Sequence, residues 1–169
     1  MLFAAGEVIL YGNQGIFRVG DIIQQDFSGT KLDYYELNGV YETQRKVFVP
    51  VKSEKLTSLM MPVLSASEVN SVIDSVDDEN IWIDNEAARK EKYKSILSSG
   101  DRRMMLLLIA TLYKHREACQ SRGRKMHQSD ERLFKEAEKL ICSEFSYVLG
   151  IEQAEVGSYI AKKLESKAS

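Results

Sequence analysis

The sequence KVFVPVKSEKLTSLMMPVLSASEVNSVIDSV, residues 46–76, decides the fold because strand character gives way to helix character within it. Residues 46–51 are β-branched and aromatic, as strands prefer. Pro50 lies near the end of this run, and since proline cannot donate to a ladder, we expect an edge strand or a strand end there. Pro62 is the last proline, so every later residue is free to be helical. The sequence therefore predicts a β front half and a helical back half.

Short strand patterns alternate with turn signals before this stretch. Apolar and aromatic runs at residues 7–11, 16–19 and 33–37 predict strands. Glycine-containing segments at 12–15 and 28–29 predict the turns between them. Strands this short, with a turn signal about every 8–12 residues, indicate a small barrel or a strongly bent sheet.

Helix signals dominate after Pro62. Residues 65–68, Ser-Ala-Ser-Glu, form a capping box before an apolar periodicity, and residues 77–80 end that helix with Asp-Asp-Glu-Asn. Gly100 predicts a helix stop, and Asp101 predicts the cap of the next helix. We expect further helices at about 85–98, at 102–120, from Ser129 or Asp130 to Leu149, and at 152–164.

These patterns predict an α+β chain. We expect a small antiparallel β domain at 1–62, a connecting helix with an acidic linker at 63–80, and an all-helical bundle domain at 81–169.

The charge of the chain is divided unevenly along its 169 residues. The net charge is −2, but residues 1–80 carry −6, residues 81–169 carry +4, and residues 86–132 carry +6. An acidic front and a basic middle suggest two modules with different partners. Lysine- and arginine-rich helices that are merely solvated give the same pattern, so charge alone leaves both interpretations open.

The composition favours a protein of a reducing compartment. Cys119 and Cys142 are too few to staple a secreted small domain, so we expect a cytoplasmic protein. No run approaches the ~18–20 consecutive apolar residues of a membrane-spanning helix. The first residues have neither a cationic start nor a long apolar run, so we expect no signal peptide.

Motifs for catalysis are missing from the sequence. It has no glycine-rich phosphate loop and no Gly-x-Ser-x-Gly elbow. His115 and His127 lack the HExxH arrangement of a zinc pair, and each cysteine stands alone. Asp77-Asp78-Glu79 is typical of a solvated linker. We therefore expect a binding protein with no enzymatic activity, no metal and no cofactor.

Trp82, the only tryptophan, follows the acidic linker and precedes a basic helix. An apolar ring flanked by cations suits a wedge in the minor groove of DNA, where lysines and arginines neutralise neighbouring phosphates. The alternative is that Trp82 packs the linker onto the helical domain. The candidate DNA-binding residues are Trp82, Arg89, Lys90, Lys92, Lys94, Arg102, Arg103, Arg122, Arg124 and Lys125.

The two arginines at the start of residues 102–120 are unusual because they oppose the helix dipole, so helix stability alone would not select them. No residue type in the candidate set demands a contact to a base edge. We expect recognition of DNA backbone and shape, with little sequence specificity.

Several stretches, taken in order, resemble the CarD/CdnL-like bacterial transcription regulators over nearly the full chain. The matching segments of the front half include Phe3-x-x-Gly6-Glu7-x-Val-Ile-Leu-Tyr11, Asp33-Tyr-Tyr-Glu-Leu37 and Val47-Phe-Val-Pro50. Those of the helical half include Leu97-Ser-Ser-Gly-Asp101 and Arg122-Gly-Arg-Lys-Met-His-Gln-Ser-Asp-Glu-Arg132. The N-terminal module of this family also occurs in the transcription-repair coupling factor.

The resemblance implies a Tudor-like N-terminal domain that binds the β subunit of RNA polymerase through an exposed strand. It implies a helical domain on promoter DNA near the upstream edge of the bubble, where a tryptophan wedge stabilises the open complex. The protein would then act in the bacterial cytoplasm, with the nucleoid. The residues carried over to the polymerase contact are Gln25, Phe27, Arg45, Lys46, Val47, Phe48 and Val49.

The chain departs from the family pattern in three places. The usual wedge tryptophan aligns with Glu86, and Trp82 lies four residues earlier. Gln25 and Phe48 occupy positions where arginine is common in the family. Gly12 replaces a proline. An adaptor of RNA polymerase without DNA contact remains the alternative function. We expect a monomer, although an exposed edge strand also permits a dimer.

Overall fold

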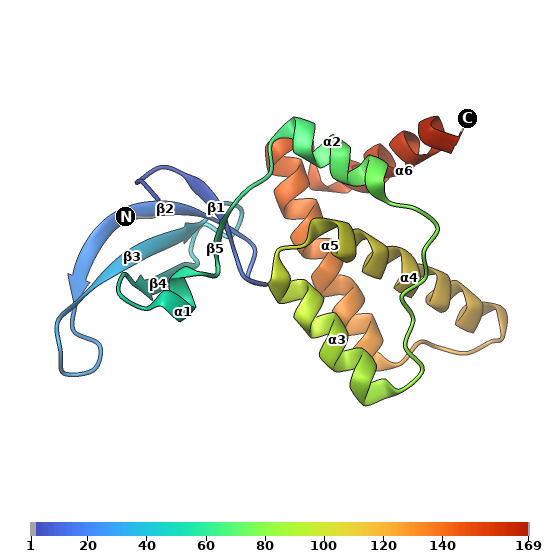
Figure 1. Cartoon of the computed structure of the whole chain (residues 1–169), viewed down its shortest axis with the longest axis horizontal. Helices are drawn as coiled ribbons and strands as arrows, with labels where there is room; N and C mark the ends of the chain where they lie inside the picture. The colour runs from blue at the N-terminus through green and yellow to red at the C-terminus, as the bar shows by residue number, and fades with distance from the viewer. Residues whose placement is uncertain (1–2, 169) are drawn as a thin grey trace. The chain divides into compact units, whose positions relative to one another are not determined.

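The computed structural model describes residues 3–168, which divide into two compact units (Figure 1). The front unit is Met1–Val63 and the helical unit is Leu64–Ser169. The chain thus has an N-terminal antiparallel sheet followed by a helical domain, as the sequence predicts. The helix within residues 63–80 packs against other helices, so it is part of the helical unit rather than a free connector.

The front unit is a five-stranded antiparallel sheet in the order β4-β3-β2-β1-β5. Its strands are β1 (Val8–Tyr11), β2 (Ile16–Gln25), β3 (Leu32–Gly39), β4 (Lys46–Pro50) and β5 (Met60–Pro62). The outer strands β4 and β5 each pair with one neighbour only, so they are edge strands of an open sheet.

Strand β2 is longer than the sequence analysis expects. The pattern predicts a strand that stops at Val19, but β2 continues to Gln25. Its pairing with β3 shifts between Val19 and Ile22, which is a bulge that bends the strand without ending it. The short helix α1 (Glu54–Thr57) and strand β5 have no sequence signal of their own, because each is too short to show a period.

The core of the front unit lies on one face of this sheet. Alternate positions of β3, Tyr35 and Leu37, are 1% and 0% exposed, and they pack with Phe17 and Val49. This is the period-two burial of a sheet with its main core on one face. Leu10, Ile16 and Tyr34 are buried outside that core cluster.

The helical unit is built around α5, which packs against each of the other four helices. The helices are α2 (Ala66–Ser75), α3 (Glu86–Ser99), α4 (Arg102–Ser121), α5 (Gln128–Leu149) and α6 (Gln153–Ala168). No helix within residues 3–168 combines the length and apolar character that a bilayer-spanning segment needs.

The helix boundaries follow local capping chemistry in most places. The predicted capping box of Ser65 and Glu68 is present, and the Asp101 side chain accepts from the Met104 N–H. The prediction that Ser129 or Asp130 caps α5 is wrong. The cap residue is His127, without a side-chain bond, because the Asp130 carboxylate is occupied inside the unit.

A buried ion pair joins the start of α4 to the end of α5. Arg102 donates from Nε and Nη2 to the two Glu144 carboxylate oxygens at 2.9 and 2.8 Å. The same carboxylate accepts the Leu64 N–H at 3.0 Å. Arg102 is 8% exposed and Glu144 1% exposed. This pair explains an arginine in the first turn of α4, and the prediction that Arg102 contacts DNA is therefore wrong.

Removing one partner of this pair should destabilise the helical unit strongly. We expect Glu144→Leu to lower the free energy of unfolding by about 3–5 kcal/mol, because Arg102 is left as an uncompensated buried charge. Urea unfolding followed by the fluorescence of Trp82 measures this, since the only tryptophan lies in the helical unit. The double variant Arg102→Met/Glu144→Leu should regain most of the lost free energy of unfolding, because it leaves no buried charge without a partner. A double variant as unstable as the single one would contradict this interpretation.

Candidate functional site

The exposed edge of β4 is the first candidate site. Ladder bonds fix its orientation, because the Gly39 N–H donates to the Arg45 carbonyl and the Val51 N–H donates to the Asp33 carbonyl. Bonded pairs alternate along an antiparallel ladder, so residues 45, 47, 49 and 51 bond to β3. Residues 46, 48 and 50 therefore face away from it.

Two free backbone donors follow from this register. The N–H groups of Lys46 and Phe48 point outward from the sheet, and the next outward position is Pro50, which has no N–H. An outer strand with outward donors is the geometry that accepts an added strand from a partner.

Aromatic side chains surround this edge on the face opposite the core. The Phe27 ring centroid lies 5.1 Å from that of Tyr34 and 5.4 Å from that of Phe48, and we call these three residues the aromatic cluster. Phe27 is 59% exposed and Phe48 36% exposed. Lys46 pairs with Glu36 on the same face at 2.8 Å. The edge thus combines free backbone donors with exposed apolar surface.

Not every predicted polymerase-facing side chain is accessible. Val49 is fully buried in the core and Val47 packs against it, so side-chain contacts by these two residues do not fit the structure. Arg45 bonds to the carbonyl and side-chain oxygens of Gln14 and is half-buried. Gln25 is exposed at the end of β2.

The second candidate site is the end of the helical unit where Trp82 lies. Trp82 belongs to a non-helical segment, residues 77–84, which we call the strap. Helix α3 begins only at Glu86, the position that aligns with the family's wedge tryptophan. Trp82, four residues earlier, therefore lies in the strap and not on an extended α3. The strap is fixed by the Ile81 N–H, which donates to Thr111 Oγ1 at 3.2 Å, and by the Ile81 carbonyl, which accepts from the Tyr93 hydroxyl at 3.0 Å.

Arg89 holds the strap from inside the unit. Its Nε and Nη2 donate to the two Asp130 carboxylate oxygens at 2.9 and 3.0 Å, and its Nη1 donates to the carbonyls of Ile83 and Asp84. Arg89 is 3% exposed. The prediction that Arg89 binds DNA phosphates is therefore wrong, because its donors are used and water is excluded from it.

The Trp82 indole is stacked within the protein. Its ring lies 3.8 Å from the His115 ring centroid, the Arg89 guanidinium lies 4.3 Å from the indole centroid, and Nε1 donates to Asp84. The side chain is half-buried. Trp82 thus packs the strap onto the helices while part of it stays accessible. No residue spacing indicates that His115 is its stacking partner.

The exposed, unpaired cations among the predicted DNA-binding residues lie in two places. Those on α3 are Lys90, Lys92 and Lys94, and those in the turn between α4 and α5 are Arg122, Arg124 and Lys125. Within residues 3–168 these six make no ion pair. The turn folds back on α4 because the Arg124 N–H donates to the Cys119 carbonyl and Gly123 adopts a positive φ of 68°. Arg103 differs, since it pairs with Asp77 and Glu79 of the strap.

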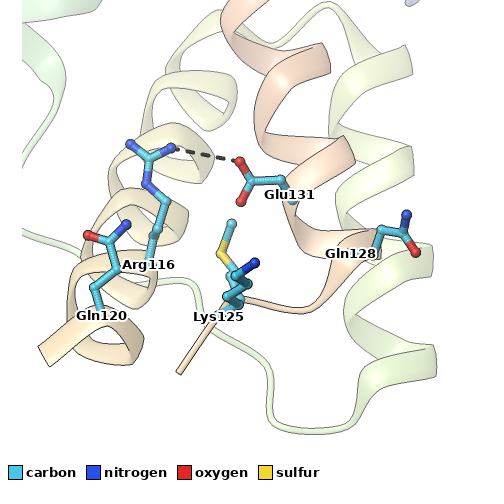
Figure 2. Close-up of a pocket in the computed structure, with 6 residues that line it drawn as sticks. Arg116, Gln120, Lys125, Gln128 and Glu131 are labelled. Carbon is cyan, nitrogen blue, oxygen red and sulfur yellow. Dashed lines mark ion pairs between the residues drawn. The ribbon is translucent and has the colours of Figure 1, made fainter. Parts of the chain in front are cut away.

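A hollow of about 480 Å³ lies beside this turn, between α4 and α5. Figure 2 shows Arg116 and Glu131 facing each other across it, joined at 3.9 Å, with Lys125 on the connecting loop. Gln120 and Gln128 lie on opposite sides and point apart. The residues around this hollow do not converge on one point as the groups of a catalytic site do. Within residues 3–168 no three histidine, cysteine or acidic side chains gather into a metal site.

Comparison with known protein families identifies the front unit. Residues 3–64 match the family described as the CarD-like/TRCF RID domain. The search of curated proteins found no match to the chain. CarD-like proteins are typically non-catalytic transcription factors.

The stack of His115 on Trp82 predicts a pH-dependent fluorescence signal. Burial lowers the pKa of His115 below its ordinary value of 6.5, so the unfolded chain binds the proton more readily than the folded unit does. Stability of the helical unit should therefore fall as the pH drops below 6.5. The Trp82 emission should fall too, with a midpoint below 6.5, because an imidazolium quenches a stacked indole. A fluorescence titration measures this.

The second histidine supplies the control for this titration. His115→Asn should abolish the transition, whereas His127→Asn should retain it with a slightly higher midpoint, because the charge of His127 also lowers the pKa of His115. A transition that persists in His115→Asn would disprove the assignment.

Proposed function

Because residues 3–64 form a CarD-like RNA polymerase-interacting domain, we propose that the protein is a transcription regulator that joins RNA polymerase to promoter DNA. The front unit binds the β subunit of the polymerase, and the helical unit contacts DNA near the upstream edge of the bubble and stabilises the open complex. The family match of the front unit is the observation that carries this proposal. The protein acts in the bacterial cytoplasm, at the nucleoid, without catalysis or a cofactor.

The polymerase contact uses the edge of β4 in this proposal. The outward N–H groups of Lys46 and Phe48 pair with a strand of the β subunit, and the aromatic cluster supplies the apolar surface beside it. Gln25 and Arg45 border the contact, and Val47 and Val49 support it from the core side. The same edge in a monomer needs protection from self-pairing, and the exposed Lys46 side chain helps to provide it.

The DNA contact uses the exposed cations of the helical unit. Lys90, Lys92, Lys94 and the turn residues Arg122, Arg124 and Lys125 neutralise backbone phosphates, while Arg89 and Arg102 only support the fold. These contacts carry no base readout, so we propose binding by charge and groove shape.

Trp82 supplies the preference for opened DNA. An indole that stacks on an exposed base contributes about 1–3 kcal/mol, and it does so only where a base is exposed. Such a differential affinity shifts the closed-to-open equilibrium by roughly one to two decades. Since the indole is stacked on His115 in the free protein, it leaves that ring when it reaches the DNA.

A polymerase adaptor without DNA contact is the competing function, in which the cations meet an acidic protein. The salt dependence of binding to a forked duplex separates the two. Binding to DNA weakens steeply as salt rises, because the cations release condensed counterions from the phosphates.

A matched pair of variants at Phe48 tests the edge contact. Phe48→Ala removes the ring and keeps the outward N–H, whereas Phe48→Pro removes both without breaking a bond to β3. We expect Phe48→Pro to bind core RNA polymerase about tenfold more weakly than Phe48→Ala, as one lost backbone hydrogen bond implies. Biolayer interferometry measures both dissociation constants. Equal affinities of the two variants would exclude strand pairing.

The lifetime of the promoter open complex tests the DNA contact. We expect the protein to lengthen this lifetime, and Trp82→Ala to remove about one decade or more of the effect because the stacked base is lost. Competitor-challenge decay of open complexes measures the lifetime. The control variant Tyr147→Ala changes an exposed aromatic residue on α5 and should leave it unaltered. An unchanged lifetime with the protein, without it and with Trp82→Ala would rule out this mechanism.

A further inference from the structure

The strap occupies two cations of α4 with its own carboxylates. Arg103 Nη2 lies 3.5 Å from the Asp77 carboxylate and 3.6 Å from that of Glu79. Lys114 Nζ lies 2.9 Å from the Asp78 carboxylate. The hydrogen bond and the charge of Lys114 hold the pKa of Asp78 below its usual range. Asp77, Asp78 and Glu79 are thus each bound to the surface of α4, whereas Asp84, the fourth acidic residue of the strap, accepts from Trp82 Nε1.

These two cations form one surface of the helix. Arg103 and Lys114 are eleven residues apart, which is three turns, so they lie on the same face about 16 Å apart along the axis. Thr111 and His115, which hold Ile81 and Trp82, belong to the same helix. The acidic residues and the indole are therefore held against α4 by one continuous segment.

The pairs are suited to being displaced. Asp77, Asp78 and Glu79 have side chains 61%, 97% and 54% exposed, and exposed ion pairs contribute little to stability. A DNA phosphate carries the same charge as the carboxylates and seeks the same guanidinium and ammonium groups. The strap and the DNA backbone compete for Arg103 and Lys114.

We propose that the strap is an autoinhibitory latch, in which Asp77, Asp78 and Glu79 cover Arg103 and Lys114 and keep Trp82 stacked on His115 until DNA phosphates displace them. This inference rests on the proposed DNA contact of the helical unit. It adds that the free protein neutralises two cations, whose side chains stay 36% and 55% exposed, with the same segment that carries the indole. Release of the strap then frees Arg103 and Lys114 for phosphates and the Trp82 indole for an exposed base. Phosphate binding and base stacking are thereby coupled.

Neutralising the strap in the full chain tests the latch. The variant Asp77→Asn/Asp78→Asn/Glu79→Gln should bind a labelled forked duplex at low salt about tenfold more tightly than a control with the same change in net charge. The control is Glu136→Gln/Glu138→Gln/Glu165→Gln, which neutralises three exposed carboxylates of α5 and α6. The dependence of log Kd on log salt should stay about the same in the wild type and the strap variant, because Arg103 and Lys114 reach phosphates in both complexes.

A fluorescence measurement without DNA accompanies the binding assay. Acrylamide should quench Trp82 more strongly in the strap variant than in the wild type or the control, because the indole is no longer held on His115. The single variant Asp78→Asn, with Glu136→Gln as its control, repeats both measurements with the least disturbance, since Asp78 is almost fully exposed.

The outcomes separate the latch from the DNA contact. An equal gain in affinity for the strap variant and the control overturns the latch and leaves the proposed function in place. Absence of DNA binding in the wild type, the control and the strap variant overturns the DNA contact, and the latch with it.

Discussion

The buried ion pair between Arg89 and Asp130 is the interaction on which the Trp82 end of the helical unit depends. It joins α3 to α5, and the remaining nitrogen of the same guanidinium holds the carbonyls of Ile83 and Asp84. The buried guanidinium makes four hydrogen bonds, so it fixes the end of the strap at Ile83 and Asp84 while this pair exists. Trp82 lies next to this fixed end and stacks on His115, whereas Asp77, Asp78 and Glu79 lie against α4 through surface ion pairs of their own.

The two units present surfaces of different chemistry. The front unit keeps an outer strand with outward donors and an aromatic cluster, which suits a protein partner that can add a strand. The helical unit carries exposed cations on α3 and in the turn after α4, and it pairs two others with carboxylates of the strap. A nearly neutral chain can thus carry one surface for a protein and another for a polyanion.

The sequence predicts most of the fold because its local signals agree. The β-branched runs, the Pro50 edge, the Ser65 capping box and the Asp101 cap all appear where the pattern puts them. Helix α1 escapes prediction because four residues are too few to show a period, and strand β5 because it has only three residues and pairs with β1, distant in the chain. Secondary-structure propensity and hydrophobic periodicity contain no information about which distant strands pair.

The candidate site is harder to predict than the fold, because a charged side chain can be buried, as Arg89 and Arg102 are. Arg89 precedes Tyr93 and Ile96 by four and seven residues, which places it on the apolar stripe of α3, and this spacing was a usable signal of burial. Its partner Asp130 lies 41 residues away, and the Glu144 partner of Arg102 lies 42 residues away. No spacing rule links residues so far apart, so the pairs, and the stacking of His115 on Trp82, emerge only from the packed helices.

Hydrogen exchange of the full chain bound in an open promoter complex tests the bridging claim most directly. The account predicts slowed exchange at the amides of Lys46 and Phe48, from pairing with the polymerase, together with slowed exchange in residues 122–125, from contact with DNA. Exchange at both segments as fast as in the free protein would contradict it.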